Sequence, residues 1–140
     1  VDITLENGWN LVSLPIMPFD GDVRDLFDRR KVKQVWGWDG QRYYRATTLA
    51  PKTGYWVFNG GARHTVSVAG HVLVFADAAV QRGWNLVGVG ASSQRAEADQ
   101  GDLFHTPDNA SVTTVMGWEG AGYQSTASLA PGKGYLVHVD

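Results

Sequence analysis

The chain has 140 residues, of which 44% are hydrophobic and 19% charged, and 12 Lys and Arg against 14 Asp and Glu give a net charge of −2. This length allows one domain, or two minimal domains of about 70 residues. A basic block and an apolar run of about 20 residues are both absent from the sequence, so we expect neither nucleic-acid binding nor a membrane span. Because the chain has no cysteine, disulfide scaffolds, thiolate metal sites and cysteine catalysis are excluded.

An internal repeat dominates the sequence. Four motifs of the first half return in the same order in the second: residues 8–12 as 83–87, 22–27 as 99–104, 35–40 as 115–120, and 49–55 as 129–135. The offset grows from 75 to 80 residues between motifs, so insertions fall in the connections, which tolerate them. We therefore predict a first β repeat over residues 1–64, bridging strands over 65–79 and a second β repeat over 80–140, all in one compact unit.

Each repeat has the composition of β structure. Residues 3–5 and 11–14 are rich in apolar and β-branched types, which is typical of strands. Asp39-Gly40 and Glu119-Gly120 separate two apolar runs and predict hairpin turns, since both central positions of such a turn take positive φ.

Helix is expected only in short stretches, at residues 22–29 and 99–105. Asp22 or Asp99 can cap a first turn there, while Leu26 and Phe27, or their counterparts, face inward. A half of about 65 residues buries too little surface alone. The expected fold is all-β, with small barrel- or sandwich-like subdomains that share a core and contain one short helical turn each.

The order of the motifs resembles a repeat of large secreted and cell-surface proteins of bacteria and archaea, whose modules carry GWNL, GWDG and L-PGKGYW segments. Here these segments are residues 8–11, 37–40 and 49–56, and the resemblance covers nearly the whole chain twice. It implies an extracellular β-rich module and transfers no catalytic residue. We expect a non-catalytic structural or adhesive role, secreted or at the cell surface. The expected partners are other domains of a parent protein, and either a glycan or a protein.

Aromatic residues fall into two groups. Those repeated in both halves are expected in the core, because large rings dominate the energy of small β cores; they are Trp9/Trp84, Trp38/Trp118, Tyr43/Tyr123 and Tyr55/Tyr135. Tyr44 and Trp56 are instead replaced by Gln124 and Leu136. Strand alternation puts them opposite Tyr43 and Tyr55.

The alternative function is a carbohydrate-binding module. Outward Trp56 and Tyr44, flanked by Arg42 and Arg45, would form a stacking platform for a sugar ring or an apolar surface for a partner. The competing interpretation is that Trp56 seals the contact between the two halves.

Enzymatic chemistry has little support in the sequence. The four histidines lack metal-ligand spacing, the serines lie outside a nucleophile elbow, and we expect no catalytic residue, no cofactor and no metal site. The carboxylates around Asp22 and Asp99 leave calcium open as an alternative. Capping of a helical turn already explains both residues.

Overall fold

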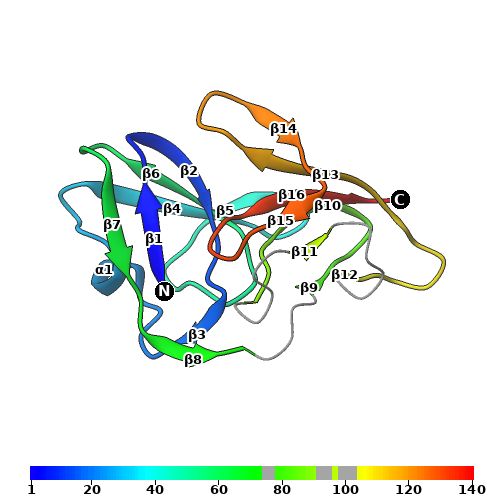
Figure 1. Ribbon diagram of the computed structural model, residues 1–140, viewed down its shortest axis with the longest axis horizontal. Helices are drawn as coiled ribbons and strands as arrows, with labels where there is room; N and C mark the ends of the chain where they lie inside the picture. The colour runs from blue at the N-terminus through cyan, green and yellow to red at the C-terminus, as the bar shows by residue number, and fades with distance from the viewer. Residues whose placement is uncertain (74–77, 91–95, 98–103) are drawn as a thin grey trace.

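The computed structural model describes residues 1–73, 78–90, 96–97 and 104–140. In this part of the chain the fold is all-β, as predicted, and it contains one short helix (Figure 1). Two four-stranded antiparallel sheets dominate it, and four two-stranded pairs accompany them. The strand orders are open, so the described strands close no barrel.

Corresponding strands occupy corresponding places in the two large sheets. The first sheet has the order β2 (Gly8–Val12), β6 (Tyr55–Asn59), β4 (Val32–Trp38), β5 (Tyr43–Arg45). The second has the order β10 (Gly83–Val87), β16 (Tyr135–Val139), β13 (Val112–Trp118), β14 (Tyr123–Ser125). Figure 1 shows β2, β4 and β6 on the left and β13, β14 and β16 on the right.

The small pairs join segments distant in sequence. They are β1 (Asp2–Leu5) with β7 (His64–Ser67), β3 (Ile16–Pro18) with β8 (Gly70–Val72), β9 (Ala78–Ala79) with β12 (Phe104–His105), and β11 (Ala96–Glu97) with β15 (Ser128–Leu129). Only β9 and β12 run parallel among them. Of the expected bridging segment, β7 and β8 pair with strands of the first half, and β9 pairs with a strand of the second.

The first expected helix is present and the second prediction needs correction. Helix α1 spans Val23–Leu26, and the Asp22 carboxylate accepts a hydrogen bond from the Arg24 backbone N–H at 2.9 Å. Phe27 is buried and Leu26 packs against the same core. Phe104 and His105, expected at the end of a second helix, lie in β12, because pairing with β9 supplies their backbone with partners. Asp99 and the residues up to 103 lie outside the described part.

The repeated aromatic residues do not share one environment. Tyr55 and Tyr135 are buried, as predicted, and each hydroxyl accepts a backbone hydrogen bond, from Ala50 at 2.9 Å and Ala130 at 2.7 Å. The core prediction is wrong for four others, which are exposed: Trp9 42%, Trp84 39%, Tyr43 49% and Tyr123 45%. These side chains belong to the face of each sheet opposite its core, because alternation along a strand sends neighbours to opposite faces.

Reciprocal contacts lock the two large sheets together. Trp38 Nε1 donates to the Trp84 carbonyl at 2.9 Å, and Trp118 Nε1 donates to the Trp9 carbonyl at 3.0 Å. A mixed cluster of Leu11, Trp56 and Leu86 is buried between the sheets.

The loops before the last strand of each half make a second reciprocal set. The Gly54 N–H donates to the Leu86 carbonyl at 3.1 Å, and the Gly134 N–H donates to the Leu11 carbonyl at 3.0 Å. A Cβ at Gly54 would lie 3.1 Å from the Val87 nitrogen, and one at Gly134 would lie 3.0 Å from the Val12 carbonyl oxygen. Glycine is required at both positions because the opposite half approaches so closely.

Helices that could cross a membrane are not found among the described residues.

Candidate functional site

The site is built on the face of the first sheet that is turned away from its core. Val35, Tyr55 and Val57 belong to the buried core, so alternation places Trp36 and Trp56 on the other face. The strand register pairs Leu11 with Trp56, Trp9 with Phe58, and Trp38 with Tyr43. We call this set the aromatic face: Trp9, Leu11, Trp36, Trp38, Tyr43, Trp56 and Phe58.

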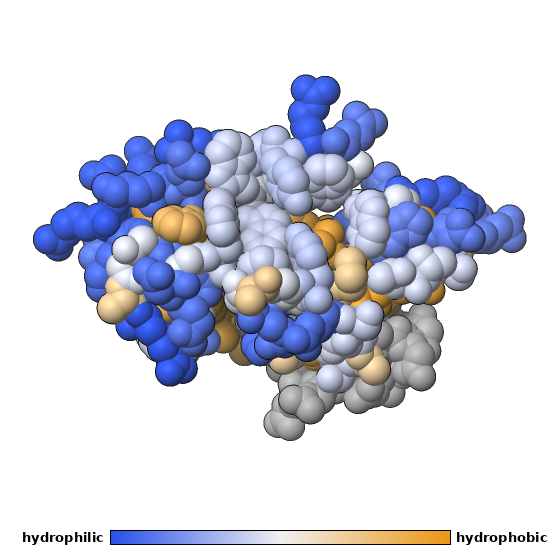
Figure 2. Space-filling model, turned by 90° about the horizontal axis from the view of Figure 1, so that it is seen from above, coloured by the Kyte–Doolittle hydropathy of each residue, from blue (hydrophilic) through white to orange (hydrophobic). Residues whose placement is uncertain are grey.

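Four of these rings line a shallow hollow of about 380 Å³, the aromatic hollow: Trp9, Trp36, Tyr43 and Trp56. Its surface is formed by apolar atoms of these residues, without exposed polar atoms. Trp9 and Tyr43 are its most exposed members, and Trp56, only 8% exposed, is the most buried. Seen from above, a pale band with visible flat rings crosses the middle of the molecule between strongly hydrophilic regions (Figure 2).

The rings stand at steep angles and support one another. Trp9 meets Trp56 at 89° with 6.3 Å between ring centroids, and meets Phe58 at 66° and 5.2 Å. The Trp36 indole N–H donates to Gln34 Oε1 at 3.1 Å, which fixes that ring on the sheet. Edge-to-face contacts of this kind are favourable for aromatic quadrupoles.

Residues of the second half pack against Trp56, one of the residues that line the hollow. Trp56 packs edge-on against Trp118 at 5.1 Å and against Tyr123 at 6.1 Å. Burial raises the pKa of Tyr123, and the nearby Tyr43 hydroxyl raises it further. The hollow therefore lies next to the boundary between the halves, and its walls are held in place by both.

The structure does not bring the predicted binding residues together. Trp56 is mostly buried between the halves, so it cannot serve as an outward platform, which fits the competing interpretation that it seals this contact. Tyr44 pairs with Gly37 on the core side of the sheet, and its ring covers that glycine so closely that a Cβ there would collide with it. Tyr44 also lies near Tyr55, whose pKa is raised first by burial and in lesser part by Tyr44.

Arg42 lies in the turn between β4 and β5. The Asp39 carboxylate accepts the backbone N–H groups of Gln41 and Arg42, both at 2.8 Å, and these bonds lower the pKa of Asp39. Arg42 is thus a turn residue close to a carboxylate, and it is not part of the hollow's lining.

Sequence reasoning missed three lining residues. Trp9 and Tyr43 are repeated in both halves and were therefore expected in the core. Trp36 has Met116 as its counterpart, so its absence from the second repeat could have singled it out as Trp56 was singled out.

The second sheet has no equivalent set of rings. The residues that correspond to the lining are Trp84, Met116, Tyr123 and Leu136. Trp84 packs against His138 at 4.8 Å instead of against a second indole. Four-ring lining is therefore a property of the first sheet.

The acidic residues around α1 form hydrogen bonds with neighbouring residues of the chain. The side-chain and backbone hydrogen bonds from Arg24 lower the pKa of Asp22, whereas a hydrogen bond with Asp20 raises the pKa of Asp25. Among the described residues, no group of three or more His, Asp or Glu is arranged to hold a metal ion. Asp99 and its neighbours lie outside that part, so calcium there stays an open alternative.

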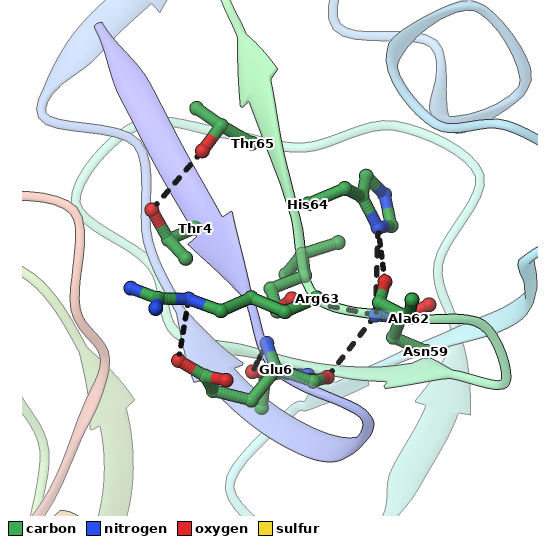
Figure 3. A network of polar contacts seen from close by, with 9 residues as sticks. Thr4, Glu6, Asn59, Ala62, Arg63, His64 and Thr65 are labelled. Carbon is green, nitrogen blue, oxygen red and sulfur yellow. Dashed lines mark hydrogen bonds and ion pairs between the residues drawn. The ribbon is translucent and has the colours of Figure 1, made fainter.

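A polar network fastens the connection between β6 and β7 to the end of β1 (Figure 3). Asn59 Nδ2 donates to the carbonyls of Leu5, Glu6 and Ala62 at 3.2–3.3 Å, and its Oδ1 accepts the Gly61 N–H at 3.0 Å. Its partners lie within the chain, which makes it a structural brace.

Comparison with known proteins gives no relative from which a function could be transferred: no protein family, no curated protein and no solved structure matches this chain.

Proposed function

We propose that the chain is a non-catalytic adhesive module of a larger secreted or cell-surface protein, and that it attaches to glycans through the aromatic hollow. In this proposal residues 1–64 and 80–140 are pseudo-symmetric repeats joined by 65–79 into one compact unit. The aromatic hollow is the observation that carries the function.

The reciprocal contacts support a single rigid unit. The two indole hydrogen bonds and the two glycine contacts each occur once in either direction between the halves. Neither half then needs to be stable alone, which suits halves of this size. A rigid unit with a fixed surface is what an adhesive module requires.

The lining supports carbohydrate as the ligand. Ring faces carry a negative quadrupole, and the C–H groups on one face of a pyranose are weakly positive. A sugar can stack on Trp9 or Tyr43 while its hydroxyls stay in water, so a lining without polar atoms is no obstacle. The hollow offers a stacking surface and no pair of acid and base groups, which supports binding over catalysis.

The expected affinity is weak. Ring contacts contribute about 0.5–1.5 kcal/mol each, so a single hollow gives affinities typical of attachment through many copies. Repetition of the module in a longer protein, or of the protein on a surface, would supply the remaining strength of attachment.

The test is a glycan-array screen followed by titration of the best glycans, with tryptophan fluorescence and calorimetry as readouts. Trp9→Ala is expected to weaken binding about two- to tenfold, the loss of one ring contact. Trp84→Ala is the matched control, because Trp84 holds the same place in the second sheet and is almost equally exposed. Binding that survives Trp9→Ala together with Tyr43→Ala would refute the hollow as the site, and absence of any glycan binding would refute the function.

A further inference from the structure

Positive charge gathers beside the hollow, on the edge strand β5. Arg45 pairs with Trp36 in the β4–β5 register and follows Tyr43 by two residues, so it lies on the same face as both. Directly paired residues on neighbouring strands have Cβ atoms about 5 Å apart. Arg45 is thus adjacent to two of the four lining rings.

A second cation lies beside Arg45. Arg45 Nη2 donates to the Lys33 carbonyl at 3.3 Å, and both residues are exposed. The ion pairs in the described part of the chain are Arg24–Asp22, Arg30–Asp28 and Arg63–Glu6. Within that part, neither Lys33 nor Arg45 therefore forms an ion pair with a carboxylate. We call Lys33 and Arg45 the cationic edge.

The second sheet lacks these charges as well as the extra rings. The counterparts of Lys33 and Arg45 are Thr113 and Ser125, and those of Trp36 and Trp56 are Met116 and Leu136. Ring lining and cationic edge thus occur together in one sheet and are missing together from the other. Two independent differences at one place indicate a ligand that uses both.

We infer that the hollow and the cationic edge together bind an acidic sugar residue, whose pyranose ring stacks in the hollow while its carboxylate or sulfate pairs with Arg45. This inference rests on the proposed glycan-binding function and names the ligand class. The carboxylate of a uronic acid projects from the edge of the ring, so a ring stacked on Trp36 or Tyr43 can direct it toward the neighbouring guanidinium. Arginine suits this role because its planar fork pairs with both oxygens of a carboxylate.

The hollow's size and shape favour one or two sugar rings. A volume of about 380 Å³ is at the small end of ligand pockets, which span about 300–1,000 Å³. Steep angles between Trp9 and its neighbours make a corner and not a long flat strip. The charge on the edge strand then decides which sugar is preferred.

The experiment compares acidic and neutral tetrasaccharides that share linkage and ring configuration. Oligomannuronate is paired with mannotetraose, oligoglucuronate with cellotetraose, and oligogalacturonate with its neutral galactose counterpart; a sulfated tetrasaccharide is added to separate sulfate from carboxylate. Calorimetry at about 20 mM salt is expected to give at least about tenfold tighter binding of an acidic member. At about 0.5 M salt the preference should shrink to about twofold, because exposed ion pairs are screened.

Variants taken from the second sheet give matched controls. Lys33→Thr with Arg45→Ser is expected to remove the preference for acidic sugars and to leave binding of the neutral sugar within about twofold, since exposed charges are not needed for folding. Trp36→Met is expected to weaken acidic and neutral sugars alike. Thermal unfolding checks that each variant is folded.

The outcomes separate the two proposals. Equal binding of acidic and neutral partners, or a preference that survives loss of both cations, would overturn this inference and leave the proposed function standing. Acidic sugar binding that is unchanged in Trp9→Ala and Trp36→Met would also overturn it, because charge alone would then explain it. If none of the sugars bound, both the proposed function and this inference would be overturned.

Discussion

Asn10 in the first sheet and Asn85 in the second make the same set of hydrogen bonds. Each accepts the backbone N–H of the residue four positions earlier, Glu6 or Gln81, at 2.9 and 3.0 Å. Each donates back to that residue's carbonyl and to the neighbouring strand at Val57 or Val137. On the outer faces the agreement is only partial: Trp9 and Tyr43 return as Trp84 and Tyr123, but Trp36 and Trp56 stand where the second sheet has Met116 and Leu136.

The comparison teaches which positions the fold requires. Many side chains that satisfy backbone groups or fill a core, such as Asn10/Asn85 and Tyr55/Tyr135, are the same in both sheets, because a change there leaves an unpaired group or a cavity. Positions on the outer face are held less strictly, so they can differ and serve a ligand. The predictions below test that division, beginning with the largest expected effect.

Substitutions at equivalent core positions should lower the stability of the fold by the same amount in both halves. Leu49→Ala and Leu129→Ala remove side chains that are 2% and 0% exposed, and each is expected to destabilise the fold by about 2–5 kcal/mol through the cavity it leaves. Urea unfolding followed by circular dichroism should show one transition in each variant, because the sheets share a buried cluster and reciprocal hydrogen bonds. Two separate transitions, each moved by only one of the variants, would contradict the single unit.

The Asn59 brace should distinguish the first half from the second, where Val139 takes the corresponding place in the register. Asn59→Val is expected to cost about 2–4 kcal/mol, since it leaves buried backbone groups of Leu5 and its neighbours unpaired. Chemical denaturation measures the loss. Thr65→Val in the neighbouring strand β7 is the control: the contact of its hydroxyl with that of Thr4 is exposed, and the substitution should cost below about 0.5 kcal/mol. A cost for Asn59→Val as small as that of the control would show that the brace is dispensable.

The reciprocal indole bonds should contribute equally. Trp38→Phe and Trp118→Phe keep a ring and remove one hydrogen bond to the opposite sheet, and each is expected to cost about 0.5–1.5 kcal/mol. Trp36→Phe is the comparison, because its indole bonds only the Gln34 side chain of its own strand. Thermal unfolding should rank Trp36→Phe as the mildest of these variants; the opposite ranking would argue against a role of the indole bonds in joining the sheets.

The smallest effects are expected at the exposed carboxylates of α1. Hydrogen bonds from Arg24 lower the pKa of Asp22, so its stabilising contribution is present at neutral pH and is lost as the pH falls through that lowered pKa. The pKa of Asp25 is raised by Asp20, so protonation of Asp25 as the pH falls through its raised pKa favours the folded state. Carboxyl NMR titration should place the Asp22 midpoint below that of Asp25. Asp22→Asn should also flatten the loss of stability in acid, and coincident midpoints would contradict the assigned partners.

Local sequence signals predicted much of the fold. The apolar and β-branched composition of residues 3–5 predicted β1, the Asp-Gly pair predicted the β4–β5 hairpin, and Asp22 predicted the start of α1. These features depend on neighbours a few residues apart, which a sequence displays directly. The prediction at Phe104 was wrong because its strand is set by pairing with Ala78, a distant segment.

The sequence by itself determined that this is a β protein whose motifs occur twice, since motifs and strand patterns are local features of the chain. Only the tertiary structure decided which aromatic residues are buried. Trp9 and Trp56 lie on one face of the same sheet, yet one is 42% exposed and the other 8%. Alternation along the strands sets that shared face, but the second half covers only part of it, and burial depends on where that cover lies. The aromatic hollow is the uncovered part of that face.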